Sequence, residues 1–403
     1  MMKCAIRPNE LWLGGDSTGL KAQGPQPNMD RQAEHRKHHT GGHAHPALRL
    51  VFWETTAGCN LQCVHCRRLE VSQELMASDL STVQGWSLID QIAVVGRPVL
   101  VFSGGEPLMR PDIFDLARHA KDHSLLTALA TNGTMIDQAL AGKIAQAGFD
   151  RVSVSLDGAD ARTHDEFRGL RGSFDQAVRA LRLLKTAGVA TQINCTIARH
   201  NQEQIGQVLA LGQQVGATAV HYFLLVPVGC GEQIADEQML DAFEVERRLL
   251  KIYDLEHSTD LQVKATCAPH YYRILRQENQ RRGLSAPASG GQDPGHPGGD
   301  PALHSITKGC LAGTAVCFVS HDGKVFPCGY LPVEAGDVRR QSFGDIWLNS
   351  PVFAELRDPA KLTGKCGQCP FKLVCGGCRA RAFYLSGDYL AEEPYCAFGA
   401  NLK

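Results

Sequence analysis

The sequence predicts an α/β fold, a partial (β/α)6 TIM-like barrel followed by a small cysteine-rich domain. Strand-like apolar segments alternate with helix-like segments from residue 48 to residue 226, which is typical of parallel βαβ units. Short polar or glycine-rich motifs directly follow several strands, at the end where a barrel has its active site. Eight cysteines lie beyond residue 303, in a segment too small and irregular to be stable by apolar packing alone.

The elements of the predicted barrel follow one another along the chain. Strands are expected at residues 48–53, 98–102, 125–131, 151–156, 191–197 and 219–226. Apolar residues with helical spacing predict helices at 80–94, 112–123, 136–147, 174–187, 202–215 and 240–253. An apolar segment at 261–266 comes next. Right-handed crossovers between parallel strands would then bring the strand ends to one edge of the barrel.

Four regions are expected. Residues 1–46 form an N-terminal extension with little periodicity, and 47–282 form the barrel. A Gly- and Pro-rich linker spans 283–303, and the cysteine-rich domain spans 304–403, with short strands and tight turns. The His-rich segment 35–45 could hold a metal ion, although biased termini are more often loosely ordered.

Composition limits the classes of function. The formal net charge is −1 over 403 residues, which does not favour nucleic-acid binding. No apolar stretch is long enough to span a membrane, and residues 1–20 do not resemble a signal peptide. Fifteen cysteines without an export signal favour metal ligation in a reducing cytoplasm over disulfides. We therefore expect a cytoplasmic protein.

Three cysteines follow the first strand. Cys59, Cys63 and Cys66 have C-x3-C-x2-C spacing, so one loop could wrap three thiolates around a metal centre. Three ligands leave one position of a four-coordinate centre open, which is typical of a reactive site. The alternatives are a zinc site with His65 as fourth ligand, or three unrelated thiols.

This motif resembles that of the radical S-adenosylmethionine (SAM) enzymes, with His65 in the place of the family's usual aromatic residue. The resemblance implies that Cys59, Cys63 and Cys66 hold a [4Fe–4S] cluster, whose open iron binds SAM and generates a 5′-deoxyadenosyl radical. The Gly104-Gly105-Glu106-Pro107 turn matches the family motif that contacts SAM. The resemblance also predicts SAM contacts from Ser155, Asp157, Arg168 and Asn194. Asp157 could equally be a helix-capping residue, and Arg168 could equally be a surface residue.

The C-terminal cysteines form the second signal. Two C-x2-C pairs could make one zinc site, but four cysteines would then be unexplained. Their order resembles the SPASM extension of radical SAM enzymes, which implies two auxiliary [4Fe–4S] clusters. The implied ligands of the first cluster are Cys310, Cys317, Cys328 and Cys378. Those of the second are Cys366, Cys369, Cys375 and Cys396.

Over most of its length the chain resembles the iron-coproporphyrin III decarboxylases, which form heme b in the siroheme-dependent pathway. The resembling stretches are 57–68, 104–113, 224–227, 264–276 and 309–330. The resemblance implies oxidative decarboxylation of two propionates to vinyl groups, with an auxiliary cluster accepting the surplus electron and a flavodoxin- or ferredoxin-type protein as reductant. Candidate substrate contacts are Arg67, Arg68, His270, Tyr271, Tyr272, Arg273 and Arg276.

Three alternatives to this function stay open. A 12,18-didecarboxysiroheme deacetylase or a SPASM peptide maturase would use the same motifs. A non-catalytic iron–sulfur electron carrier would need neither the GGEP turn nor an open-site cysteine loop. The candidate substrate residues could also simply form a helix face, because Tyr272 and Arg276 are one helical turn apart.

Overall fold

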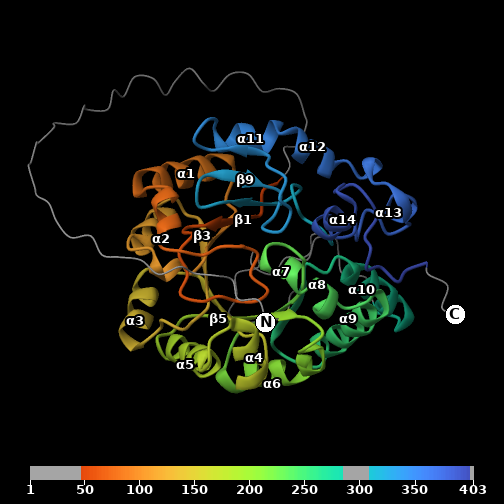
Figure 1. Cartoon of the computed structure of the whole chain (residues 1–403), viewed down its shortest axis with the longest axis horizontal. Coiled ribbons are helices and arrows are strands. Elements are labelled where there is room, and N and C mark those ends of the chain that lie inside the picture. The colour runs from red at the N-terminus through yellow and green to blue at the C-terminus, as the bar shows by residue number, and fades with distance from the viewer. Residues whose placement is uncertain (1–46, 285–307, 400–403) are drawn as a thin grey trace, which may run out of the picture. The chain divides into compact units, whose positions relative to one another are not determined.

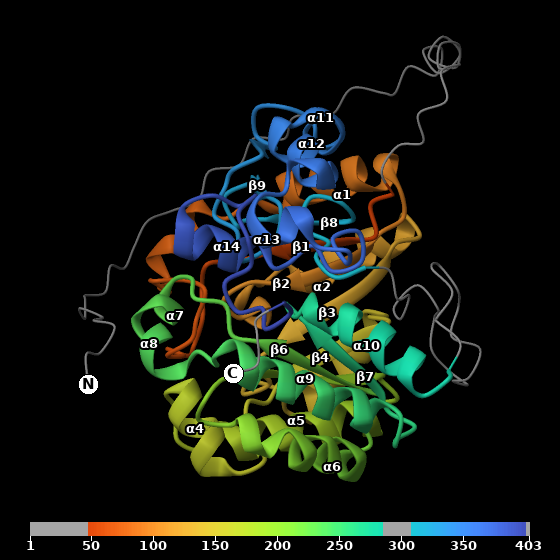
Figure 2. The same cartoon turned by 90° about the vertical axis from the view of Figure 1, so that its right-hand side faces the viewer.

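A computed structural model describes residues 47–284 and 308–399. The expectations for residues 1–46, including the His-rich metal site, and for nearly all of the linker lie outside these residues. Seven parallel strands form the barrel wall, in the order in which they occur in the chain. They are β1 (Leu50–Glu54), β2 (Val99–Ser103), β3 (Leu126–Thr131), β4 (Arg151–Ser155), β5 (Thr191–Ile197), β6 (Ala219–Leu224) and β7 (Gln262–Thr266). In Figure 2, β1, β2, β3 and β4 follow one another from the top of the view downward.

Helices cover the outside of this wall (Figure 1). The crossover helices are α1 (Thr82–Val95), α2 (Ile113–Asp122), α3 (Gln138–Gln146), α4 (Ala161–Arg168), α5 (Ser173–Thr186) and α6 (Ile205–Val215). Two short helices, α7 (Cys230–Gln233) and α8 (Ala235–Gln238), precede α9 (Ala242–Glu256), and α10 (His270–Arg281) follows β7. The predicted partial barrel is confirmed, and the apolar segment at 261–266 forms its seventh strand.

The barrel does not close. Instead, β8 (Val316–Val319) pairs in parallel with β1, with Val51 opposite Cys317, on the side away from β2. Two antiparallel strands, β9 (Lys324–Phe326) and β10 (Gly336–Asp337), continue the sheet. The cysteine-rich segment therefore extends the same sheet as the barrel, and the predicted boundary at residue 304 stays a prediction.

The cysteine-rich segment also contains helices that the sequence interpretation missed. These are α11 (Phe343–Asn349), α12 (Pro351–Arg357), α13 (Gly364–Gln368) and α14 (Arg379–Ser386). Trp347 and Phe353 are fully buried and belong to the same core cluster as Trp53 of β1. No helix in the described ranges is long and apolar enough to cross a membrane.

Candidate functional site

The loop after β1 carries the three predicted metal-ligating cysteines, and each sulfur accepts an N–H group. The backbone N–H groups of Leu61 and Arg68 donate to the sulfurs of Cys59 and Cys66, each at 3.5 Å. The Arg168 guanidinium donates to the sulfur of Cys63 at 3.6 Å. Burial raises the pKa of Cys59 to about 12. A buried thiolate needs positive partners to be stable, and a bound metal would supply the strongest of them.

The turn after β2 packs directly against this loop. The backbone N–H of Glu106 donates to the Gly58 carbonyl at 2.7 Å, and that of Gly105 donates to the Thr56 carbonyl at 2.9 Å. A Cβ atom at Gly105 would collide with the Gly58 carbonyl and would lie 2.9 Å from the Cys59 Cβ. Glycine is therefore required at position 105 by close backbone approach.

The Glu106 side chain is fully buried and ties the end of β2 to the end of β3. Its carboxylate accepts hydrogen bonds from the Thr131 hydroxyl and from the backbone N–H of Asn132, each at 2.8 Å. Burial raises its pKa to about 7. Glu106 thus positions the turn through its side chain, and a direct SAM contact stays a prediction.

Asp157, Arg168 and His65 form one buried group beside the cysteine loop. Arg168 pairs with the Oδ2 atom of Asp157 at 2.6 Å, and the Nε2 atom of His65 lies 3.4 Å from the same oxygen. The His65 ring stacks on Phe167, with ring centroids 4.0 Å apart. Burial lowers the pKa of His65 to about 3, so the imidazole is neutral. Asp157 therefore orients Arg168 toward the sulfur of Cys63.

Ser155, the last residue of β4, lies beside Asn194 in the middle of β5. The Oδ1 atom of Asn194 accepts a hydrogen bond from Gln192 at 2.6 Å. Ser155 is at the strand end that leads to Asp157, whereas Asn194 lies three residues before the end of β5; their contacts with SAM stay predictions.

The arrangement of the first C-terminal thiol group favours a ligand set that differs from the predicted one. Cys267, Cys328 and Cys378 belong to one apolar cluster, and charges on Cys378, Cys328 and Cys310 all raise the pKa of Cys267, after burial as the main cause. Cys317 instead lies on β8 within the barrel core, where burial raises its pKa and no other cysteine contributes. The role of Cys317 as a ligand stays a prediction, which its full burial in the core of the sheet does not favour. We call Cys267, Cys310, Cys328 and Cys378 the inner thiol group.

Sequence reasoning missed Cys267 because it precedes the linker, in the barrel part of the chain. It follows β7 directly, at the strand-end edge that also carries the cysteine loop. Its backbone has a positive φ of 53°, which is uncommon for a residue other than glycine and points to a functional constraint. Its place immediately after a barrel strand is the signal that could have identified it.

The four cysteines of the second predicted C-terminal thiol group lie around one cavity. Cys366, Cys369, Cys375 and Cys396, which we call the outer thiol group, line one cavity of about 180 Å³. The sulfurs of Cys369 and Cys375 accept backbone N–H groups two residues further along the chain, each at 3.4 Å. Four free thiols around one cavity are the donor set of a four-thiolate iron–sulfur cluster.

Glu393 joins the two thiol groups. Its backbone N–H donates to the sulfur of Cys366 at 3.3 Å, and its carboxylate accepts from the backbone N–H of Cys378 at 2.5 Å. The buried Arg381 pairs with that carboxylate at 3.0 Å. The Arg381 charge also lowers the pKa of Cys378 against the larger effect of burial, which raises it. Glu393 and Arg381 therefore fix the position of the outer thiol group relative to the inner thiol group.

The predicted substrate residues of α10 do not lie together. His270 and Arg273 line the cavity of the outer thiol group, and the Arg273 guanidinium is paired with Glu246 and donates to Gln277 at 2.7 Å. The Tyr271 hydroxyl is bonded to Glu256, and Arg276 is exposed. Their substrate roles stay predictions.

Arg67 and Arg68 directly follow Cys66 of the cysteine loop, which we also call the SAM-cluster loop. Both arginines pair with one buried carboxylate. Arg67 is bonded to Glu54 and lies over the Phe318 ring, 4.2 Å from its centroid. Arg68 pairs with the other oxygen of Glu54 at 2.9 Å. Two cations share one anion here, so the group carries one surplus positive charge.

Family models match both parts of the chain. The radical SAM superfamily model matches residues 53–211, and an iron–sulfur cluster-binding domain model, SPASM, matches residues 310–370. The chain belongs to the radical SAM superfamily and carries its SPASM extension. It is an enzyme that binds SAM and [4Fe–4S] clusters, which excludes both the electron-carrier alternative and a zinc site in place of the clusters.

Within this superfamily the chain is similar to AdoMet-dependent heme synthases. The one from Methanosarcina barkeri is 47% identical over 357 residues, covering 89% of this chain and 98% of the relative. The one from Oleidesulfovibrio alaskensis is 42% identical over 403 residues, covering 100% and 98%. The Fe-coproporphyrin III synthase of M. barkeri is 31% identical, covering 86% and 87%.

Solved structures agree with the fold. Streptococcus suis SuiB bound to S-adenosylmethionine matches with a TM-score of 0.63 at 17% identity, covering 87% of this chain and 75% of that one. Native anSMEcpe with bound AdoMet matches with a TM-score of 0.62 at 20% identity, covering 87% and 94%.

Proposed function

We propose that the protein acts in heme biosynthesis, where it converts two propionate side chains of iron-coproporphyrin III to vinyl groups and so yields heme b. The similarity to heme synthases over nearly their whole length supports a porphyrin substrate. The structural observation that carries the proposal is the placement of Arg67 and Arg68 directly after the cysteine loop and of Tyr330 beside the inner thiol group. We infer that these three side chains form the substrate-binding surface.

Tyr330 defines this surface. Its side chain is partly buried against the apolar cluster that contains Cys378, and burial is the main cause that raises its pKa. The negative charges of Cys267, Cys328 and Asp157 raise the pKa of Tyr330 further. The positive charge of Arg67 lowers it. Tyr330 therefore lies within electrostatic reach of both the inner thiol group and the SAM side of the barrel, where a substrate of both centres must bind.

The surplus charge of the Arg67–Glu54–Arg68 group suits an anionic substrate. A propionate that binds Arg67 would complete a pair in which each arginine has its own carboxylate. Phe318 supports the plane of the Arg67 guanidinium, so its donors keep a fixed direction. Glu54 is only 1% exposed, which limits competition from water for these bonds.

Each propionate must lose one hydrogen atom, one molecule of CO2 and one electron to become a vinyl group. When bound, SAM and the clusters supply the radical that removes the hydrogen atom and an acceptor for the electron. The protein residues hold the carboxylate in its ionised form, through Arg67, and orient the macrocycle edge, through Tyr330. A flavodoxin- or ferredoxin-type protein would supply electrons for SAM cleavage.

A binding titration tests the substrate assignment. Iron-coproporphyrin III is added anaerobically to cluster-loaded wild type, Arg67→Gln, Tyr330→Phe and Arg118→Gln, which is an exposed control on α2. Loss of a charged hydrogen bond costs about 1.5–3 kcal/mol, so Arg67→Gln should bind roughly ten- to a hundred-fold more weakly. Unchanged affinity in both site variants, with iron content equal to wild type, would refute this binding surface.

A further inference from the structure

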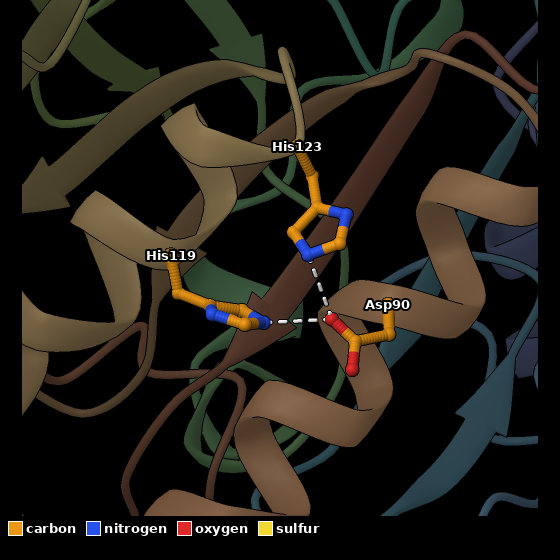
Figure 3. A group of neighbouring side chains, drawn as sticks. All are labelled: Asp90, His119 and His123. Carbon is orange, nitrogen blue, oxygen red and sulfur yellow. Dashed lines mark hydrogen bonds and ion pairs between the residues drawn. The ribbon is translucent and has the colours of Figure 1, made fainter. Parts of the chain in front are cut away.

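Three potential metal ligands converge on the outside of the barrel, away from the thiol groups. Asp90 lies on α1, and His119 lies in the last turn of α2. His123 caps α2, four residues after His119, so the two imidazoles are on one face of the helix. Figure 3 shows both rings directed at the same carboxylate.

The distances between these atoms are short. The Nε2 atoms of His119 and His123 lie 2.7 and 3.0 Å from the Oδ1 atom of Asp90. One ligand atom from each residue lies within 4.8 Å of the others. Tetrahedral zinc with bonds of about 2.0–2.1 Å has ligand–ligand edges of about 3.3–3.4 Å. An ion would therefore need the two nitrogen–oxygen distances to lengthen by about 0.3–0.7 Å and the two imidazole nitrogens to lie about 3.3–3.4 Å apart.

We propose that Asp90, His119 and His123 bind a divalent transition-metal cation of the zinc class, which joins α1 to α2. Two imidazole nitrogens and one carboxylate oxygen match the preference of such cations, whereas Ca²⁺ and Mg²⁺ prefer oxygen ligands alone. The side chains of Asp90, His119 and His123 are 51%, 28% and 39% exposed, so the ion can enter directly from solvent. Water fills the remaining coordination positions.

The position of the site indicates a structural role. The C-terminal end of α2 leads into the start of β3, whereas the cysteine loop and the GGEP turn follow the ends of β1 and β2. The two sites are therefore at opposite ends of the strands. In such barrels the C-terminal ends of the strands carry catalysis, whereas the N-terminal ends contribute to stability. A bound cation would hold α1 and α2 together where Trp86 also packs against His119, with ring centroids 5.8 Å apart.

Hydrogen exchange with Zn²⁺ tests the proposal on the full-length, cluster-loaded enzyme under anaerobic conditions. Zn²⁺ should slow amide exchange in residues 82–95 and 113–123 of the wild type. His119→Ala/His123→Ala should abolish this protection, and Asp90→Asn should raise the Zn²⁺ concentration for half-protection at least tenfold. His257→Ala, at the end of α9, is the matched histidine control and should behave as wild type.

The location of the effect distinguishes this site from others. The histidines of segment 35–45 are present in every variant, so zinc bound by them cannot explain a difference confined to α1 and α2. Iron content measured before and after addition shows that the clusters stay intact. Asp90→Asn keeps a hydrogen-bond acceptor for both histidines, so it remains informative if the double variant does not fold. Absence of protection in the wild type, or protection that survives in both variants, would overturn the proposal.

Discussion

A backbone N–H group two residues further along the chain is directed at the sulfur of four of the predicted cluster cysteines. The residue two positions after Cys59, Cys66, Cys369 and Cys375 donates to each sulfur at 3.4–3.5 Å. Cys230 instead donates its own S–H to the Arg68 carbonyl at 3.0 Å, as a protonated thiol does. Hydrogen bonds to sulfur stabilise the thiolate and tune the potential of a bound cluster.

The ligand set of the inner thiol group gives the first prediction. Cys267→Ala should lose one cluster, so iron falls from about twelve to about eight per chain, at four irons per cluster. Cys317→Ala is the matched control and should keep all of the iron, because Cys317 only packs in the core. Iron analysis and Mössbauer spectroscopy measure the difference. If Cys317→Ala loses the cluster and Cys267→Ala retains it, the assignment is reversed.

The pH dependence of stability has a defined contribution from His164. Its Nδ1 atom accepts from the backbone N–H of Asp157 at 3.0 Å, and burial lowers its pKa from 6.5 to about 4. As the pH falls below 6.5 the unfolded chain takes up this proton first, so the free energy of unfolding decreases between pH 6.5 and about 4. The loss at pH 5.5 should be about 1.4 kcal/mol.

Urea denaturation at pH 7.5 and pH 5.5 measures this contribution. His164→Asn keeps an acceptor near the Asp157 N–H group but cannot be protonated in this range, so its difference between the two pH values should be smaller by that amount. His257→Asn, at the surface end of α9, should retain the wild-type difference. An equal pH dependence in the wild type and His164→Asn would contradict the assignment.

At the scale of elements, contact between the loops after β1 and β2 shapes the SAM-cluster site. Gly105→Ala should prevent this contact, because the new Cβ would meet the Gly58 carbonyl and Cys59. We expect loss of the SAM-binding cluster and of SAM cleavage, with the C-terminal clusters retained. Gly142→Ala, within α3 with nothing near its Cβ, should instead add about 0.5–1 kcal/mol of stability. SAM cleavage by Gly105→Ala at the wild-type rate would disprove this role.

The sequence predicted the barrel elements closely because their apolar patterns are strong. The strand 191–197 coincides with β5, and the helix 174–187 differs from α5 by one residue at each end. The missed helix α4 has only two buried residues, His164 and Phe167. It is fixed by the cap of Asp160, whose side chain accepts from Thr163, and such local bonds leave no periodic pattern to detect.

At the scale of the whole molecule, the SPASM segment extends the open barrel sheet beyond β1. β8 covers the edge of β1, and Phe343, Trp347 and Phe353 extend the core beyond it. A chain that ends at residue 304 should expose a strand edge and apolar surface, so we expect aggregation. Size-exclusion chromatography checks this outcome. A monomeric truncated enzyme that cleaves SAM would show that the barrel is independent.

This long-range pairing also explains why the thiol groups could not be fully assigned from sequence. The pairing of β8 with β1 decides that Cys317 faces the core, and no local pattern around Cys317 shows it. The distance along the chain from Cys267 to Cys310 includes the linker, so their proximity depends on how β7 and the SPASM segment fold together. The grouping of Cys366, Cys369, Cys375 and Cys396 came from the resemblance to the SPASM order, because closeness in sequence alone would have included Cys378.

The most direct test of the proposed function is anaerobic turnover of iron-coproporphyrin III with the cluster-loaded enzyme, SAM and a reductant, followed by mass spectrometry. We predict loss of two carboxyl groups in sequence, a transient mono-vinyl intermediate, heme b as the product and one SAM cleaved for each vinyl group. If the enzyme cleaves SAM but iron-coproporphyrin III keeps its starting mass, the decarboxylase proposal is contradicted, and a deacetylase or maturase activity takes its place.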